Sequence, residues 1–132
     1  MEAPSTGRLA EAYLSHARRQ DASTQWAVDR VMDLTYEERW EDLWAMLLAI
    51  ARREEQIEAE ALAFVAAGPL EDLTCKAGPA FIDRIEHEAK FNAQFGRLLT
   101  GVWLSRADPS VRERVVKFCR AFSRPIDGSY AF

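Results

Sequence analysis

The sequence has 132 residues, of which 48% are hydrophobic and 29% are charged, a balance typical of a soluble globular protein. Its length predicts one domain, 1–132, large enough to bury a core without disulfides or metal ions. No apolar run approaches the roughly 18 residues of a membrane span, and the first residues lack the pattern of an export signal, so we expect a cytoplasmic protein without a membrane partner. Cys75 and Cys119 fit a reducing compartment as free thiols, and the sequence leaves a disulfide between them open.

The net charge of −4 is unevenly distributed along the chain. Residues 1–75 hold 15 acidic and 7 basic side chains, a balance of −8, whereas residues 76–132 hold 6 acidic and 10 basic side chains, a balance of +4. Such an asymmetry can mark a surface that meets a charged partner. It can equally arise when the two halves of a fold pack together and their charges pair across the contact.

Three helices are predicted in the first half of the chain. Ser5 or Thr6 can cap a first helix over roughly 7–20, and a second helix follows over about 24–34. The third is predicted over about 36–53.

The third helix is predicted to organise the fold. Its apolar residues recur with the 3.6-residue period of a helix that packs on a core, and Met46 and Ile50 widen this stripe. The residues of the stripe are Trp40, Leu43, Trp44, Leu47, Leu48 and Ala51. A helix that is apolar on most of its circumference belongs inside a domain, so we place it at the centre. Thr35 and Glu38 have the spacing of a capping box at its start.

Two Gly-Pro pairs follow in the second half. A glycine often closes one helix and a proline often begins the next, which is the order found at Gly68-Pro69 and again at Gly78-Pro79. The pattern predicts that helices end at both pairs and that 69–77 forms a short helix of its own.

Helical spacing continues over 79–91 and beyond a cap or kink at Asn92. Asp108 followed by Pro109 is a strong signal for the start of the last helix. The tail over 123–132 has a turn dipeptide between apolar residues, and we expect it to pack back onto the domain.

The predicted fold class is all-α, because no alternating run is long enough for a strand. We expect a compact array of seven or eight short helices around the Trp- and Leu-rich central helix. All four tryptophans are expected in the core rather than around a ligand: Trp26, Trp40, Trp44 and Trp103.

Residues 40–105 combine the Trp- and Leu-rich helix, the hexapeptide Gly-Pro-Leu-Glu-Asp-Leu at 68–73 and a helix that ends near Trp103. In this combination the sequence resembles an uncharacterised bacterial domain family whose hallmark is that hexapeptide. The resemblance implies an all-helical fold and a bacterial cytosolic origin, and it implies no chemistry. The chain departs from the family pattern at 92–93, where an Asp-Pro-like break is expected, and at 76–77, where a histidine is expected.

No signature of an enzyme is present, neither a phosphate loop nor a nucleophile elbow. Glu71 and Asp72 can hold a cation or a partner's arginine, or they can stabilise the N-terminus of their own helix. Adjacent residues of a helix cannot share a face, so one of them should point toward a neighbouring helix or a ligand. His16 is expected to be structural, and His87 with Asp83 supplies only two of the ligands that zinc needs, so we predict no metal and no cofactor.

Ten carboxylates and three arginines lie between Thr35 and Asp72. We therefore predict a non-catalytic protein-interaction module whose acidic surface docks a basic partner protein, as an inhibitor or immunity-type protein does. The predicted partner-binding residues are Glu37, Glu38, Glu41, Glu54, Glu55, Glu58, Glu71 and Asp72. A merely solvated acidic face is the simpler explanation of the same pattern.

Two other functions stay open at this point. One is contact with nucleic acid, disfavoured by the overall acidity, through the basic residues of the C-terminal part: Arg97, Arg112, Arg114, Lys117, Arg120 and Arg124. The other is an enzyme with a site around Glu71 and Asp72 beside a pocket lined by tryptophan, which requires a concave pocket with convergent polar groups.

Overall fold

The computed structural model describes residues 5–122 and 125–126, whose regular elements are all helices, so the predicted all-α class is confirmed. The α-helices are α1 (Thr6–Arg19), α2 (Gln25–Tyr36), α3 (Trp40–Ala51), α4 (Ala59–Val65), α5 (Glu71–Phe91), α6 (Ala93–Thr100) and α7 (Pro109–Ala121). A 3₁₀ turn, η1 (Ala22–Thr24), precedes α2, and a π-helical turn, η2 (Ala66–Leu70), joins α4 to α5. Since η1 runs into α2 and the three elements from α4 to α5 follow without a break, the described residues form six separate helical segments, slightly fewer than predicted.

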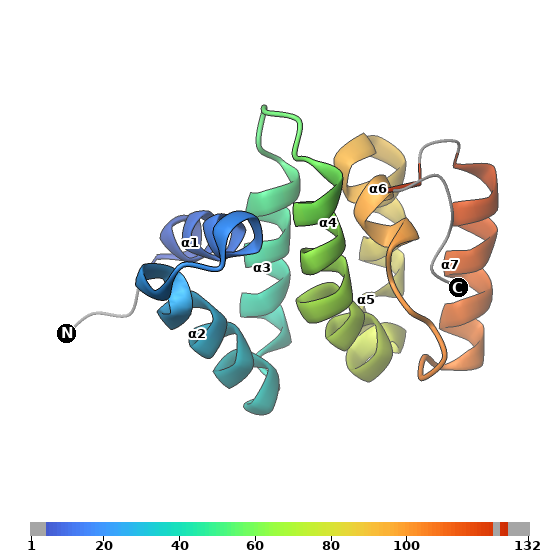
Figure 1. Cartoon of the computed structure of the whole chain (residues 1–132). Helices are drawn as coiled ribbons and strands as arrows, with labels where there is room; N and C mark the ends of the chain where they lie inside the picture. Colours follow the sequence, from blue (N-terminus) through green and yellow to red (C-terminus); the bar gives the residue numbers. More distant parts are fainter. Residues whose placement is uncertain (1–4, 123–124, 127–132) are drawn as a thin grey trace.

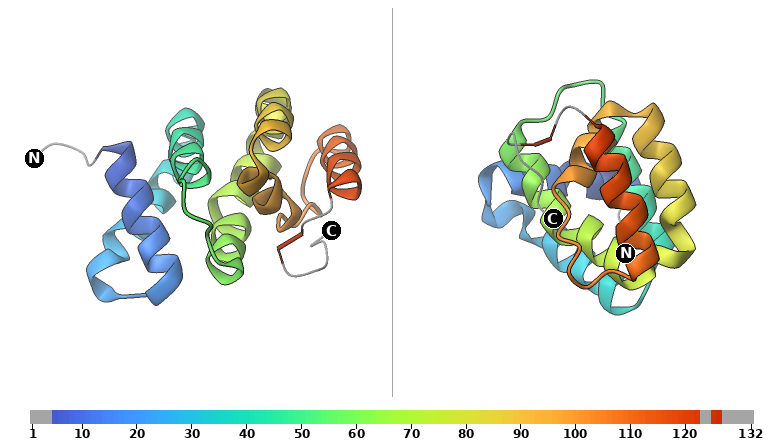
Figure 2. Two further views of the ribbon diagram at one scale, coloured as in Figure 1. Left: turned by 90° about the horizontal axis from the view of Figure 1, so that it is seen from above. Right: turned by 90° about the vertical axis from the view of Figure 1, so that its right-hand side faces the viewer.

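The helices lie side by side in a row, with α1 and α2 at one end and α7 at the other (Figure 1). The view from above in Figure 2 shows the same order. Inside this row, α3 packs against α1, α2, α5 and α6, and six of its 12 residues are buried. The central position predicted for this helix is therefore confirmed.

Three helices begin at side chains that the sequence marks as caps. The hydroxyl of Ser5 accepts a hydrogen bond in the first turn of α1, at 3.1 Å. Asn92 accepts two in the first turn of α6, at 3.0 and 3.1 Å. Asp108 accepts one in the first turn of α7, where Pro109 needs no donor.

The capping box predicted at Thr35 and Glu38 is wrong. Helix α2 continues to Tyr36, and the hydroxyl of Thr35 donates to the carbonyl of Val31 one turn back, at 3.0 Å. Helix α3 starts only at Trp40 and has no side-chain cap. The central helix is therefore shorter at its N-terminus than the predicted 36–53.

The chain reverses between α2 and α3 through a Schellman motif. The N–H of Arg39 donates to the carbonyl of Leu34 at 2.8 Å, and the N–H of Glu38 donates to that of Thr35 at 3.1 Å. Glu38 supplies the left-handed residue of this motif, with φ of 56°. Glycine is usual at that position, so the sequence carries no sign of the helix end.

The helix ends predicted at the two Gly-Pro pairs are also wrong, because the chain stays helical from Ala59 to Phe91. Gly68 and Pro69 fall in η2, where a π-helical turn accommodates a residue that lacks an N–H donor. Figures 1 and 2 show that the helical path bends between α4 and the far end of α5 instead of ending.

Gly78 and Pro79 lie in the interior of α5. A Cβ atom on Gly78 would stand 3.0 Å from both Cγ atoms of Val111 in α7. The glycine is thus explained by the close approach of two helices and not by a turn. This is a tertiary reason that local sequence cannot reveal.

The tryptophans differ in burial. Trp44 is buried and meets Phe95 edge-on at 5.5 Å between ring centroids, whereas Trp26 and Trp40 are partly buried. Trp103 is 55% exposed and lies in the loop after α6. The predicted core position is therefore wrong for Trp103, since α6 ends three residues earlier, at Thr100.

The C-terminal end of the described chain packs on α5 and α6 through α7. Ile126 is buried, and its N–H donates to the hydroxyl of Thr100 at 3.2 Å. The rest of the tail predicted to pack back, 123–124 and 127–132, lies outside the described residues.

Candidate functional site

Two cavities lie beyond the opposite ends of α3. The polar cavity, about 730 Å³, is bounded by the segment after α3 and by the junction of α5 and α6. The aromatic cavity, about 540 Å³, is bounded by α2, the start of α3, η2 and the first turns of α5. A 12-residue helix is about 18 Å long, so the two cavities are separate sites.

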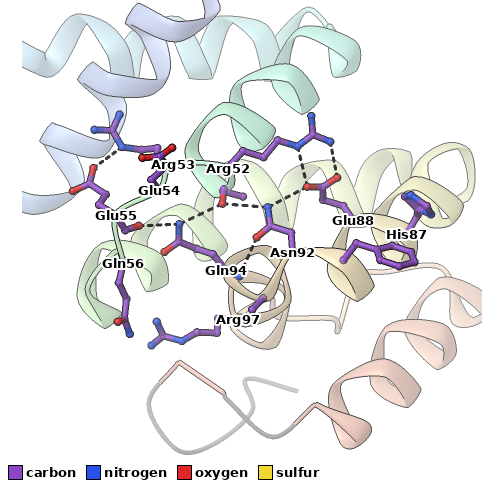
Figure 3. A pocket seen from close by; sticks show the side chains of 13 residues that line it. Arg52, Arg53, Glu54, Glu55, Gln56, His87, Glu88, Asn92, Gln94 and Arg97 are labelled. Carbon is purple, nitrogen blue, oxygen red and sulfur yellow. Dashed lines mark hydrogen bonds and ion pairs between the residues drawn. The ribbon is translucent and has the colours of Figure 1, made fainter.

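Several of the polar groups around the polar cavity bind one another, among them Arg52, Glu88 and Asn92 (Figure 3). The side chain of Glu88, 10% exposed, accepts hydrogen bonds from Arg52 Nε at 3.0 Å and Nη2 at 2.8 Å and from Asn92 Nδ2 at 3.1 Å. The hydrogen bonds from Arg52 lower the pKa of Glu88 more than its burial raises it. Glu88 is therefore ionised at neutral pH and neutralised by Arg52.

Gln94 ties the same cavity to the segment between α3 and α4. Its side-chain oxygen accepts from the N–H of Ile57 at 2.8 Å, and its side-chain nitrogen donates to the carbonyls of Ala51 at 3.3 Å and Glu55 at 3.4 Å. These bonds satisfy backbone groups that no helix satisfies. Gln94 and Asn92 thus hold the loop after α3 in place, which explains these two residues without a ligand.

The aromatic cavity combines aromatic rings with carboxylates. Its walls include Tyr13 of α1, Tyr36 of α2 and Trp40 of α3, together with Glu38 and Asp72. These residues come from three separate stretches of the chain, at 13, 36–40 and 72, which the tertiary fold brings together.

Glu71 and Asp72 face different ways, as adjacent residues of a helix must. Glu71 accepts from the backbone N–H of Trp103 at 3.2 Å and lies 3.5 Å from the guanidinium of Arg106. Asp72 lines the aromatic cavity, with its carboxylate 4.0 Å from Nζ of Lys76. Because η2 runs into α5 without a break, there is no free helix N-terminus here, and the alternative that both residues answer a helix dipole is wrong.

Tyr13 is a buried residue whose hydroxyl opens to this cavity. The residue is 4% exposed, and its ring lies 5.6 Å from that of Phe64. A Cβ atom on Gly68 would stand 3.0 Å from the hydroxyl oxygen, which has no hydrogen-bond partner among the described residues. Burial and, next, the carboxylate of Asp72 raise the pKa of Tyr13, so the hydroxyl stays protonated.

Two large apolar side chains stand exposed at the aromatic cavity. Met32 is 56% and Tyr36 is 88% exposed, and both line the cavity. Neither residue was singled out as a site residue from the sequence. The signal was their spacing of four residues, which places both on one face of α2, beside the face buried at Val31 and Leu34.

The carboxylates predicted to bind a partner do not form one surface. Those within 37–41 lie before or at the start of α3, and those within 54–58 follow its end. Five of the eight lie within 4.0 Å of a basic side chain, namely Glu41, Glu55, Glu58, Glu71 and Asp72. Glu37, Glu38 and Glu54 have no such partner among the described residues.

Pairing between the two halves of the chain accounts for part of the charge asymmetry. Arg84 donates to both carboxylate oxygens of Glu41, at 2.9 and 2.7 Å, and these hydrogen bonds lower the pKa of Glu41. Within the acidic first half, a hydrogen bond from Arg18 also lowers the pKa of Glu58. Such exposed pairs contribute little to stability, but they leave less negative charge free for a partner.

The histidines have local partners. His16 is buried, with Nδ1 3.0 Å from the hydroxyl of Thr24, and His87 lies against Phe91 with 4.9 Å between ring centroids. Over 5–122 and 125–126, no three His, Cys, Asp or Glu side chains are grouped as a metal site requires.

The basic residues considered for nucleic acid are dispersed. Arg114 pairs with Asp83 and Glu86, Arg97 borders the polar cavity, and Arg124 lies outside the described residues. Three others share the exposed side of α7: Arg112, Lys117 and Arg120.

Comparison with known proteins adds a family. Residues 15–122 match the family of unknown function DUF6869, and no curated protein and no solved structure matches the chain. The match agrees with the resemblance to a family without an assigned activity and extends beyond residues 40–105, on which that resemblance was based. Among the residues that the structure describes, no helix has both the length and the apolar character needed to cross a bilayer.

Proposed function

We propose that this chain, which belongs to the DUF6869 family of unknown function, is a non-catalytic protein-interaction module of the bacterial cytoplasm. It binds a basic partner protein at the aromatic cavity and the adjoining turn between α2 and α3, in the manner of an inhibitor or immunity-type protein. The free thiols of Cys75 and Cys119 support a reducing compartment.

One observation carries the proposal: exposed apolar side chains and unpaired carboxylates occur together. Met32 and Tyr36 are exposed at the aromatic cavity, while Glu37 and Glu38 follow them directly and have no basic partner in the described part of the chain. Exposed apolar side chains that border a cavity are a common feature of binding surfaces. An acidic edge adds attraction for a basic partner and speeds its association.

The acidic residues beyond the other end of α3 support docking less well. Glu55 and Glu58 pair with Arg18, and Glu88 pairs with Arg52. We therefore assign the partner-binding role first to Glu37, Glu38 and Asp72 among the predicted carboxylates.

Affinity capture from a bacterial lysate at low and high salt tests this assignment. The unmodified chain should retain a basic protein whose capture falls as salt rises. Charge reversal in Glu37→Lys/Glu38→Lys and loss of apolar surface in Met32→Ser/Tyr36→Ser should each release that same protein. Glu54→Lys is the matched control, because Glu54 is equally unpaired but lies beyond the opposite end of α3.

Capture that both double variants leave unchanged would refute the proposed surface. Release by Glu54→Lys with retention by Glu37→Lys/Glu38→Lys would place docking at the wrong end of α3 and would also refute it. Circular dichroism of each variant establishes that the fold is intact.

A further inference from the structure

The aromatic cavity is built like a receptor for a cation. Tyr13, Tyr36 and Trp40 line it, and the faces of such rings attract a cation placed over them within about 6 Å of the ring centroid. Two carboxylates, Glu38 and Asp72, line the same space. Rings and carboxylates together provide both kinds of contact that an organic cation uses.

The hydroxyl of Tyr13 offers a polar contact inside the same cavity. Tyr13 is 4% exposed as a residue, but its hydroxyl oxygen is open to the cavity and has no hydrogen-bond partner among the described residues, so it is available to a ligand. It lies against Gly68, which lines the cavity too. A ligand group entering beside Asp72 would supply the partner.

The cation that the chain itself places there is weakly held. Lys76 lines the cavity with its ammonium 4.0 Å from Asp72, and its side chain is 51% exposed. At that distance and exposure the pair is weak. An incoming cation can therefore displace Lys76 toward solvent.

We propose that the aromatic cavity binds an arginine side chain of the partner protein. Its guanidinium lies between Asp72 and Glu38, stacks on Trp40 and donates to the hydroxyl oxygen of Tyr13. Arginine fits better than lysine, because the planar guanidinium both stacks on aromatic rings and donates in parallel to carboxylates. This inference rests on the proposed function and specifies the group that the partner inserts.

A model ligand tests the cavity without the partner. N-acetyl-arginine amide is titrated into the full chain and followed by ¹H–¹⁵N NMR of the Trp40 indole, assigned with Trp40→Phe, with the Trp103 indole as internal control. The neutral isostere N-acetyl-citrulline amide and the cation N-acetyl-lysine amide are titrated in parallel. We expect the arginine amide to shift the Trp40 signal saturably and the other two to bind about tenfold more weakly or less, the size expected for one charge-assisted hydrogen bond.

Two variants locate the response. Asp72→Asn should weaken arginine amide binding by about tenfold, whereas Asp42→Asn, the same change on the exposed side of α3, should leave it unchanged. Equal binding of citrulline or lysine amide, no response at Trp40, or unchanged binding by Asp72→Asn would overturn the proposal. Thermal unfolding of both variants shows whether either change affects the fold instead.

Capture of the partner separates this inference from the proposed function. Suppose that Asp72→Asn and Trp40→Leu retain the partner while Glu37→Lys/Glu38→Lys releases it. The proposed docking surface is then supported, and the proposed binding of an arginine in the aromatic cavity is refuted. If none of these variants affects capture, the docking surface itself is wrong.

Discussion

Arg52 covers Glu88 on its solvent side, with two hydrogen bonds between guanidinium and carboxylate at 3.0 and 2.8 Å. The Arg52 side chain is 60% exposed and that of Glu88 is 10% exposed. The pair thus joins the end of α3 to the end of α5 through a charge that is largely removed from water.

Replacing this carboxylate should destabilise the fold in a pH-dependent way. Glu88→Gln should lower the free energy of unfolding at pH 7 by about 1–2 kcal/mol, the loss expected for charge-assisted bonds to a partly exposed arginine. The pKa of Glu88 in the folded chain lies below its ordinary 4.5, so its contribution is complete above pH 4.5. That contribution is lost as the pH falls through the lower folded value. Urea unfolding at pH 7 and near pH 3, followed by tryptophan fluorescence, measures the difference.

Glu41 provides the control for this prediction. It forms the same two-bond contact with Arg84, but its side chain is 73% exposed. Glu41→Gln should therefore change stability little at either pH. If Glu41→Gln lowered the free energy of unfolding as much as Glu88→Gln, burial of Glu88 would not be the reason for its contribution.

A glycine should stabilise the turn between α2 and α3. Glu38 has φ of 56°, and Gln20 at the end of α1 has φ of 49°. Glu38→Gly and Gln20→Gly should each raise the free energy of unfolding by about 0.5–1 kcal/mol, because the left-handed backbone strains a residue with a Cβ atom. Glu37→Gly, at φ of −81°, should lower it. Thermal or urea unfolding measures the sign of the change in the free energy of unfolding. A lower free energy of unfolding for Glu38→Gly and Gln20→Gly would contradict the explanation.

The contact between α5 and α7 should not tolerate an added methyl group. Gly78→Ala should destabilise by about 1–3 kcal/mol, because Val111 is buried and stiff and its methyl groups leave no room. Gly7→Ala is the matched control, since nothing lies within 4 Å of a Cβ atom there, and it should stabilise by about 0.5–1 kcal/mol. In a Val111→Ala background the penalty at Gly78 should shrink, which a double-mutant cycle measures.

The two thiols should differ in reactivity. Burial raises the pKa of Cys119 to about 12, and burial followed by Glu71 raises the pKa of the half-buried Cys75. Since the thiolate is the reactive form, a disulfide reagent at pH 8 should modify Cys75 slowly and Cys119 only after unfolding. Cys75→Ser should abolish the slow phase, and rapid labelling of two thiols in the native protein would contradict the structure.

The parts of the fold that sequence predicts are those with local causes. Ser5, Asn92 and Asp108 cap helices because each side chain reaches N–H groups two or three residues away, and the periodic stripe of α3 marks burial. The Gly-Pro pairs were misleading. Gly78 is needed because it lies against Val111, which follows 33 positions further along the chain. Whether a glycine or proline ends a helix therefore depends on contacts with residues far away in the sequence.

The candidate site was only half visible in the sequence. Asp72 could be singled out because one of two adjacent carboxylates must point away from the other. The rings around it could not, because Tyr13, Tyr36 and Trp40 belong to three helices and Trp40 was expected in the core. Met32 is exposed because none of the described helices covers its side of α2. The periodicity of apolar residues cannot show which side of a helix stays uncovered.

The order of the helices gives the molecule an electric polarity along its row. The exposed side of α7, with Arg112, Lys117 and Arg120, stands at the opposite end of the row from α2 (Figure 1), and the unpaired Glu37 and Glu38 directly follow α2. A dipolar body of this kind rotates in the field of a basic protein before the two surfaces touch. On a negatively charged support the chain should adsorb through the basic side of α7, so that the aromatic cavity faces the solution.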